Sequence, residues 1–404
     1  MNSESKGIRY LFLDNIKVLF TILVIFWHTM VTYAEVGWWY YQEPNPVDPI
    51  SYFIFLLLTS IGAVFQTSLL GLFFLLGGYF TPNSYDRKGI WSFWKERLIR
   101  LGIPLLLYIV LINPLMIFVL SKLGISPWNT NPLLQGTFLD YYLNIFLSWE
   151  NFINFLSFGG PMWFLRVLLI FTAIYTLWRQ ITKLSTVQRK IPEQVSIPRF
   201  FYLLLLAIGL GFLTFIVRIF LPIDVRPLEI PWGQLIQYLM MFSIGVICVR
   251  YLWFEKISKK HVKIWLTTII IALIIIYIDF IIAIIIDVDL IEFTGGANLH
   301  AFIMALVDNV VSMGVIFILI KVFYAKFNKQ GPILHNLSTS AYHMYLLHPL
   351  VLVALSLGIA SLSLIPIIKV GIVIPLTILF CYLISHYILQ KLHLRKPKNE
   401  LKNN

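Results

Sequence analysis

Charged side chains are scarce in this sequence. Asp, Glu, Lys and Arg make up 12% of its 404 residues, whereas hydrophobic residues make up 59%. Soluble globular domains carry about 25% charged residues, so this composition excludes an ordinary soluble domain. Apolar runs such as 265–286 are longer than the roughly 20 residues that a helix needs to cross the hydrocarbon of a bilayer. The sequence therefore predicts an integral membrane protein built from helices.

Cysteine is nearly absent as well. Cys248 and Cys381 are the two present, and both fall inside apolar runs, where neither a structural disulfide nor a thiolate metal site is expected. We assign no metal site. The first apolar run is too long for a signal-peptide core and lacks a small-residue cleavage site, so it is interpreted as a retained span. Without internal repeats or low-complexity tracts, residues 1–404 are predicted to form a single membrane domain.

Ten apolar segments predict an all-α, polytopic membrane protein whose termini lie on the same side. Most of the 31 Lys and Arg residues fall in the termini and in the loops of that side. By the positive-inside rule we expect a multi-pass protein of the cell membrane with cytoplasmic N- and C-termini. The basic excess reflects this topology, so the bilayer is an expected partner and nucleic acid is not. The predicted spans lie near residues 11–34, 51–80, 101–121, 161–180, 200–221, 233–254, 262–286, 301–324, 338–360 and 364–389.

The first span carries three polar residues in an apolar stretch, LDNIKVLFTILVIFWHTMVTY. On a helix, Asp14 and Lys17 lie within about 40° and 20° of His28 around the axis, and Lys17 stands about 16 Å nearer the cytoplasm than His28. Asp14 and Lys17, at i,i+3, can pair. Charges at this depth cost several kcal/mol unless they pair or face a cavity. The three residues therefore predict a polar stripe across the membrane.

Two interpretations of this stripe stay open. One is structural: an ion pair together with a histidine that is hydrogen-bonded to a neighbouring helix. The other is catalytic, because histidine is the usual general base near neutral pH.

The same stretch resembles the first span of the membrane acyltransferase-3 family, which acylates hydroxyl groups of extracytoplasmic glycans. That family has a Leu-Asp pair, an Arg, ten residues and a catalytic His. Here the pair is Leu13-Asp14, the histidine is His28, and Lys17 stands where the family has Arg. Lysine keeps the charge but lacks the planar, bidentate fork of arginine. The resemblance implies that His28 is the general base and that Asp14 and Lys17 belong to the catalytic site.

A second part of the resemblance lies in residues 73–108. An apolar run ending in Gly-Gly-aromatic is followed by a basic loop, an R-x-x-R pair and a small-residue-Pro entry into the next span. Arg97 and Arg100 are this pair, and at i,i+3 they share one helix face. The resemblance implies that they hold the phosphates of an acyl-coenzyme A, since guanidinium groups bind phosphate bidentately. The alternative is ordinary positive-inside charge.

Two further segments are similar to family motifs and imply substrate contacts. In GPMWFLRVLLIF (160–171), Trp163 lies at the predicted outer interface and Arg166 three residues deeper; interfacial Trp is also common without such a role. In LSTSAYHMYLLHPL (337–350), the matching residues are Ser340, Tyr342, Tyr345 and His348, each of which could instead be a hydrogen-bonding core residue. Asp279 and Asp308 are further carboxylates in spans for which the resemblance implies no role.

The resemblance as a whole implies an enzyme that transfers an acyl group, such as acetyl or succinyl, from a cytoplasmic donor to a carbohydrate hydroxyl outside the cell. Acyl-coenzyme A is the expected co-substrate, and no permanently bound cofactor is expected. A secondary transporter of an organic anion or a glycan precursor is the alternative, because it too is a basic-inside helical bundle with charges in its spans. The sequence carries no indication of the oligomeric state.

Overall fold

The protein is helical throughout the part of the chain that the computed structural model describes, and no strand occurs there. Nine helical stretches of this part are long and apolar enough to cross a bilayer. The expected all-α, polytopic membrane fold is thereby confirmed. The described residues are 10–34, 39–43, 49–126, 136–147, 149–157, 159–184 and 195–389.

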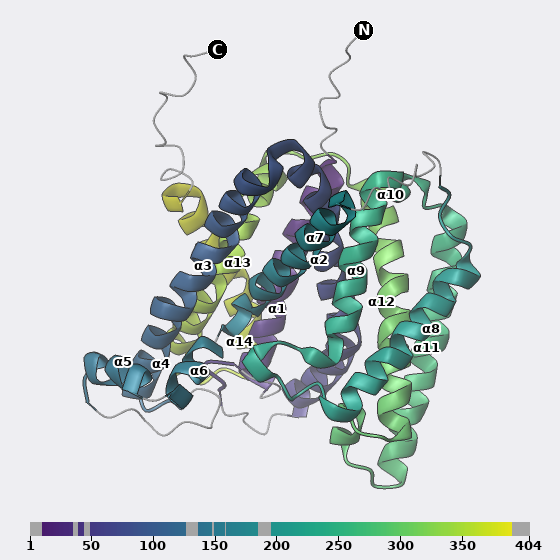
Figure 1. The fold of residues 1–404 in the computed structure, drawn as a ribbon. Helices are drawn as coiled ribbons and strands as arrows, with labels where there is room; N and C mark the ends of the chain where they lie inside the picture. The colour runs from purple at the N-terminus through teal and green to yellow at the C-terminus, as the bar shows by residue number, and fades with distance from the viewer. Residues whose placement is uncertain are drawn as a thin grey trace, which may run out of the picture. The chain divides into compact units, whose positions relative to one another are not determined.

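Figure 1 shows the helices of the described residues. In chain order they are α1 (Leu11–Ala34), α2 (Pro49–Arg97), η1 (Leu98–Gly102), α3 (Ile103–Leu107), η2 (Tyr108–Ile112), α4 (Asn113–Lys122), α5 (Phe138–Leu147), α6 (Trp149–Ser157), η4 (Gly160–Met162), α7 (Trp163–Leu184), α8 (Phe200–Phe220), η5 (Pro227–Glu229), α9 (Trp232–Tyr251), α10 (Trp253–Lys256), α11 (Lys259–Ile285), η6 (Leu290–Phe293), α12 (Leu299–Lys326), α13 (Pro332–Gly358), α14 (Pro366–Ile384) and η7 (Ser385–Leu389).

One of the nine stretches, Thr67–Lys122, contains 56 residues, enough for two passes. It is folded at Gly89, whose φ of 70° and ψ of 168° are not helical. No atom lies within 4 Å of a Cβ built there, so the glycine supplies backbone freedom rather than close packing. The segment predicted as a basic loop is thus helical on both sides of one sharp turn, and the Arg97 Nη2 donates to Thr81 Oγ1 across it at 3.1 Å.

The chain groups into two compact units. Unit 1 comprises Met1–Ser60, Leu115–Tyr141 and Ala325–Asn404, and unit 2 comprises Ile61–Pro114 and Tyr142–Tyr324.

In unit 1, α1, α13 and α14 pack against one another (Figure 1). Polar side chains in the first three turns of α1 fix this arrangement. The Asn15 Nδ2 donates to the carbonyls of Phe327 and Lys329, at 2.6 and 3.1 Å. The Thr21 Oγ1 donates to the carbonyl of its own helix at Lys17 and approaches that of Ala341 on α13 at 3.3 Å. These bonds set the position of α1 beside α13, and with it the position of His28.

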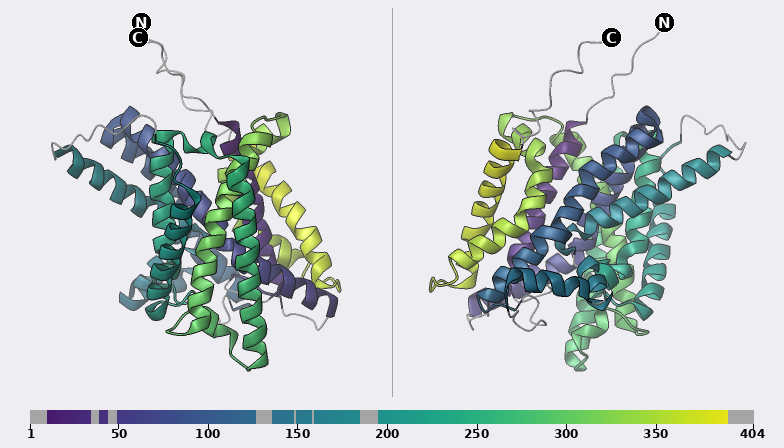
Figure 2. Two further views of the ribbon diagram at one scale, coloured as in Figure 1. Left: turned by 90° about the vertical axis from the view of Figure 1, so that its right-hand side faces the viewer. Right: turned by 60° about the vertical axis from the view of Figure 1, so that its left-hand side comes forward.

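In unit 2, α7, α9 and α12 contact the part of α2 that belongs to this unit, and α8 packs against α9. The next two long helices in the chain, α11 and α12, pack against each other (Figure 2). Two glycines let the backbones of α2 and α9 touch. A Cβ on Gly78 would lie 1.9 Å from the Phe242 carbonyl oxygen, and a Cβ on Gly245 would lie 2.0 Å from that of Leu75. Close backbone approach of this kind is a usual way for membrane helices to associate.

The core of unit 2 also contains charges. Arg218 of α8 and Asp308 of α12 are buried and paired, with 2.7 Å between Nη2 and Oδ2. Asp279 of α11 lies 2.9 Å from His300 Nδ1 of α12. Each carboxylate within a span therefore has a basic partner, which meets the requirement that charges in the membrane be paired.

Candidate functional site

The polar residues of α1 lie on one continuous helix, as the sequence predicts. Lys17 Nζ and Asp14 Oδ1 are 2.9 Å apart, so the expected i,i+3 pair is formed. The pair is partly exposed, since the Lys17 side chain is 37% exposed and that of Asp14 is 17% exposed. His28 lies further along α1 and is itself half-buried.

His28 meets a second histidine, which comes from α13. The His348 Nε2 lies 3.2 Å from the His28 Nδ1, and the two rings are stacked with centroids 5.0 Å apart. His348 is fully buried, and its Nδ1 lies 2.5 Å from the carbonyl oxygen of Tyr345. The His28 Nδ1 lies 3.0 Å from the carbonyl oxygen of Val24, one turn back on its own helix.

These contacts determine which ring nitrogens carry protons when both imidazoles are neutral. A backbone carbonyl only accepts, so the proton of His348 is on Nδ1, donated to Tyr345, and its Nε2 is an acceptor. His28 Nδ1 faces two acceptors, the Val24 carbonyl and the His348 Nε2, so it carries the proton of its own ring. The Nε2 of His28 is therefore left with a free lone pair, which is the form that a general base requires.

The segment that follows α1 places an indole ring, that of Trp39, against His28. Trp39 is 3% exposed, and its ring stacks on the His28 ring with centroids 4.2 Å apart and planes at 23°. The Trp39 Nε1 is buried, and no acceptor for it occurs among the residues that the structure describes. His28 is thus bounded by two rings, those of Trp39 and His348, which limit rotation of the imidazole.

The segment 39–43 is itself fixed at its far end. The Glu43 backbone N donates to the Thr32 carbonyl oxygen at 2.9 Å. The Glu43 carboxylate accepts from Lys369 Nζ of α14 at 2.5 Å, and the same Nζ donates to the Ala360 carbonyl at 3.2 Å. Burial and the nearby Glu43 carboxylate raise the pKa of the Tyr41 phenol, so Tyr41 stays protonated at neutral pH. The predicted site did not include Trp39, Glu43 or Lys369, although a lysine inside an apolar run is a signal for a buried partner.

The remaining predicted residues of α13 are not equally close to His28. Tyr345 adjoins His348, with ring centroids 5.7 Å apart. Ser340 is buried, and its carbonyl oxygen lies 3.4 Å from Ser385 Oγ of η7. The Tyr342 ring lies 5.9 Å from that of His343. The structure therefore brings His348 to His28 and Tyr345 to His348, whereas Ser340 and Tyr342 have other neighbours.

Arg97 and Arg100 belong to unit 2, where Arg97 is the last residue of α2 and Arg100 lies in η1, the π-helical turn that follows. Arg97 is half-buried, with its guanidinium over the Phe93 ring, whereas Arg100 is exposed. The two guanidinium groups are close enough to repel each other. Two cations in one place, one of them at the surface, are suited to binding an anion such as phosphate.

Trp163 and Arg166 also belong to unit 2, at the start of α7. The Trp163 ring stacks with that of Tyr238, centroids 6.1 Å apart. Arg166 donates to three backbone carbonyls, those of Leu156, Ser157 and Leu228. Its guanidinium thereby supplies hydrogen-bond donors to backbone carbonyls at the end of α6 and in η5. These bonds explain how a charge near the membrane boundary is compensated.

No group of three or more His, Cys, Asp or Glu side chains that could hold a metal ion occurs among the described residues. In unit 1 the structure brings two imidazoles together, those of His28 and His348.

A family model described as an acyltransferase domain matches residues 10–386. A curated relative, the glucans biosynthesis protein C of Escherichia coli O6:K15:H31 (strain 536 / UPEC), is 28% identical over 166 residues. That alignment covers 41% of this chain and 38% of the relative, so the chain matches well under half of the relative's length. No solved structure matches.

Proposed function

This chain belongs to the acyltransferase-3 family, and we propose that it transfers an acyl group from a coenzyme A thioester, reached from the cytoplasm, to a hydroxyl of an extracytoplasmic carbohydrate. The observation that carries the proposal is the hydrogen bonding of His28, which leaves its Nε2 unprotonated and able to accept a proton. The resemblance of the polar stripe on α1 to the catalytic span of the family supports the same role.

The reaction proceeds as follows. The Nε2 of His28 takes the proton of the acceptor hydroxyl, and the oxygen attacks the thioester carbonyl carbon. The carbon–sulfur bond breaks, and the thiolate of coenzyme A takes the proton back from the imidazolium. The products are the ester of the carbohydrate and free coenzyme A. While His28 is protonated, the Val24 carbonyl and the His348 Nε2 accept from its Nδ1 and stabilise the charge.

The donor is held by cations in this proposal. Arg97 and Arg100 bind its phosphates, and Lys17, with Asp14, guides the donor along the polar stripe. Trp163, Arg166, Ser340 and Tyr345 contribute to the substrate sites. Arg166 does so by fixing the backbone around η5 and the end of α6.

The acceptor that we favour is a glucan. Support comes from the name of the relative, which refers to glucan biosynthesis. We place the protein in the cell membrane with both termini cytoplasmic, because Lys and Arg gather in the loops of that side.

The test is a donor-consumption assay on the purified full-length chain in detergent. Free thiol should appear from acetyl- or succinyl-coenzyme A only when a glucan is added, and mass spectrometry should find the ester on the glucan. A transporter cannot show this turnover, because it needs two compartments. Release of thiol that does not depend on any carbohydrate, with no ester formed, would reject acyl transfer to a carbohydrate.

A further inference from the structure

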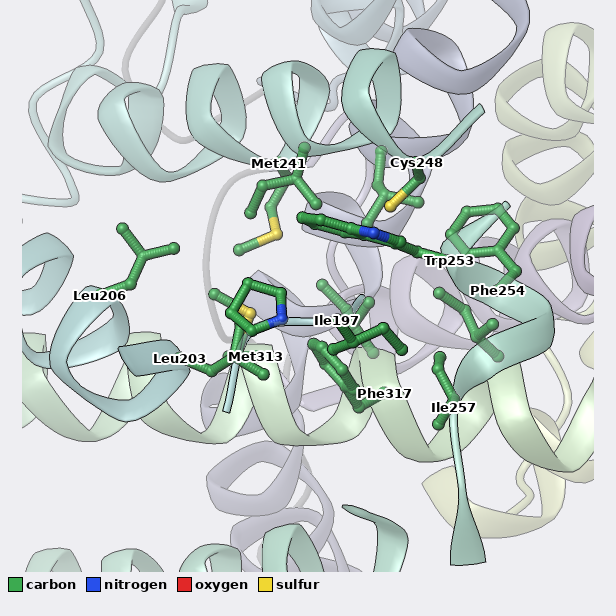
Figure 3. Close-up of a pocket in the computed structure, with 15 residues that line it drawn as sticks. Ile197, Leu203, Leu206, Met241, Cys248, Trp253, Phe254, Ile257, Met313 and Phe317 are labelled. Atoms are coloured by element: carbon green, nitrogen blue, oxygen red, sulfur yellow. The ribbon is translucent and has the colours of Figure 1, made fainter. Parts of the chain in front are cut away.

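Unit 2 contains an apolar cavity that the proposed reaction does not use. Its volume is about 140 Å³, and every side chain that lines it is apolar or a thiol (Figure 3). Met241 and Cys248 of α9 face Met313 and Phe317 of α12 across it, and Trp253 closes one side. Such a cavity offers no hydrogen bond to a sugar or a nucleotide, so its occupant must be a hydrocarbon group.

A short turn between α9 and α11 carries the lining residues Trp253, Phe254 and Ile257, and we call this side of the cavity its mouth. Leu252 has a φ of 54°, a left-handed conformation that costs a non-glycine residue free energy. This turn directs the next residue, Trp253, so that its ring lines the cavity while its Nε1 donates to the Val195 carbonyl at 3.1 Å. A tryptophan with an apolar ring inside and a satisfied N–H at the edge is typical of the membrane–water interface.

Two cations are chain neighbours of residues that line the cavity. Arg199 directly follows the lining residue Pro198, and Lys256 directly precedes the lining residue Ile257. Both are exposed, and the Lys256 Nζ donates to Val195, the same carbonyl that accepts from Trp253. Exposed Lys259 and Lys260 come next in the chain, whereas Glu255 is the one acid in 253–260. An apolar cavity with a net positive edge is complementary to a molecule that has a hydrocarbon chain and an anionic head.

We propose that this cavity binds an acyl chain of an anionic phospholipid from the leaflet on the Lys- and Arg-rich side, with Arg199 and Lys256 at its phosphate. Lysine and arginine at the membrane surface attract anionic lipids. A bilayer supplies such a lipid at high local concentration, and the interfacial Trp253 places the mouth at headgroup depth. The site is independent of the acyl transfer proposed above, because none of its residues takes part in that reaction.

Native mass spectrometry of the full-length protein, reconstituted with a mixture of phosphatidylglycerol and phosphatidylcholine, tests the site. We expect phosphatidylglycerol to be retained selectively. The double variant Arg199→Gln, Lys256→Gln should bind it about twenty-five-fold more weakly, since each surface cation contributes about a factor of five. Lys326→Gln with Lys329→Gln, two exposed cations outside the lining, is the matched control and should retain it. Met313→Trp fills the cavity and should abolish retention.

Cys248 gives a second readout that needs no variant. A bound acyl chain shields its thiol, so alkylation by a membrane-permeant reagent should slow when phosphatidylglycerol is added. Cys381, the buried cysteine of unit 1, is the internal control and should react at an unchanged rate. The proposal would be overturned by equal retention of the two lipids or by unchanged binding in the double charge variant. It would also be overturned if long-chain acyl-coenzyme A protected Cys248 and phosphatidylglycerol did not.

Discussion

The His348 Nε2 lies 3.2 Å from the His28 Nδ1, although 320 residues separate the two histidines in the chain. Both rings are held by backbone carbonyls, His28 by Val24 and His348 by Tyr345, and these bonds give both rings the same tautomer. The relation resembles the acid–histidine pair of hydrolytic triads, in which a buried group orients the base through its Nδ1. Here the orienting group is an uncharged imidazole, so it stabilises a protonated His28 less than a carboxylate would.

The first prediction concerns His28 itself. His28→Ala and His28→Gln should both lower the rate by about 10²–10⁴, the usual contribution of a general base. Because the base must be unprotonated, the rate of the parent enzyme should fall as the pH is lowered through the titration of the imidazole. Thiol release from the donor at several pH values measures both effects. His335→Gln, at the start of α13, is the control for loss of a histidine.

Glutamine is the sharper of the two replacements. It keeps hydrogen-bonding capacity and similar bulk, so a histidine with a structural role only should tolerate it better than alanine. A His28→Gln protein that acylates its acceptor at close to the parent rate would show that His28 is not the base.

The second prediction separates orientation from binding at His348. His348→Leu removes the acceptor for His28 Nδ1 and should lower kcat by about tenfold, since one hydrogen bond contributes about 0.5–1.5 kcal/mol. The KM values for donor and acceptor should stay nearly unchanged, because His348 is buried behind His28. His348→Gln retains an acceptor oxygen and should recover part of kcat. A rise in KM with an unchanged kcat would assign His348 to substrate binding instead.

Lys17 tests whether charge suffices where the family has arginine. The Lys17 side chain is 37% exposed, so its pair with Asp14 should stabilise the protein by only about 0–1 kcal/mol. Lys17→Met should therefore fold normally but lose activity, whereas Lys17→Arg should keep it. Thermal unfolding in detergent and thiol release are measured on the same preparations. Equal activity in all three proteins would make Lys17 a structural residue.

The pair Arg97 and Arg100 tests the phosphate-binding role. Replacing both with Gln should raise the apparent KM for the donor by more than about tenfold, because hydrogen bonds to charged groups contribute about 1.5–3 kcal/mol each. The KM for the acceptor should not change. Lys95→Gln, an exposed cation on the same helix, is the matched control. Unchanged donor affinity in the double variant would exclude the role.

Much of the fold follows from the sequence, because few backbone structures can span a membrane. A bilayer requires every backbone group to be bonded within the span, so long apolar runs predict helices directly. The Asp14–Lys17 pair also follows, since i,i+3 neighbours on one helix must lie close. Gly89 was not identified as the turn between two helical arms, because a single glycine in a polar segment fits a loop equally well.

The surroundings of His28 could not be predicted in the same way. Trp39 stacks on it from a segment that has no periodic pattern, and stacking depends on how that segment returns over α1. Lys369 and Glu43 are 326 residues apart in the chain, so no local spacing predicts their contact. The same is true of Arg218 and Asp308 in unit 2. Sequence spacing constrains contacts within a helix, whereas contacts between helices depend on packing that a single sequence does not specify.

The last prediction uses the Lys369–Glu43 pair, which holds the segment carrying Trp39. The Lys369 side chain is 2% exposed and that of Glu43 15%, so removing one partner leaves a buried, uncompensated charge. Glu43→Gln or Lys369→Met alone should lower the free energy of unfolding by about 3–5 kcal/mol. The double variant should recover most of this loss, because it leaves neither charge behind.

The exposed Arg179–Asp86 pair is the control for that experiment. The Asp86 side chain is 51% exposed, so Asp86→Asn should change the free energy of unfolding by only about 0–1 kcal/mol. Activity adds an independent readout, since freeing the 39–43 segment removes the ring that limits rotation of His28. The double variant should therefore regain stability but not full kcat. Additive losses in the double variant would show that Lys369 and Glu43 contribute independently and that their contact does not fix the segment over His28.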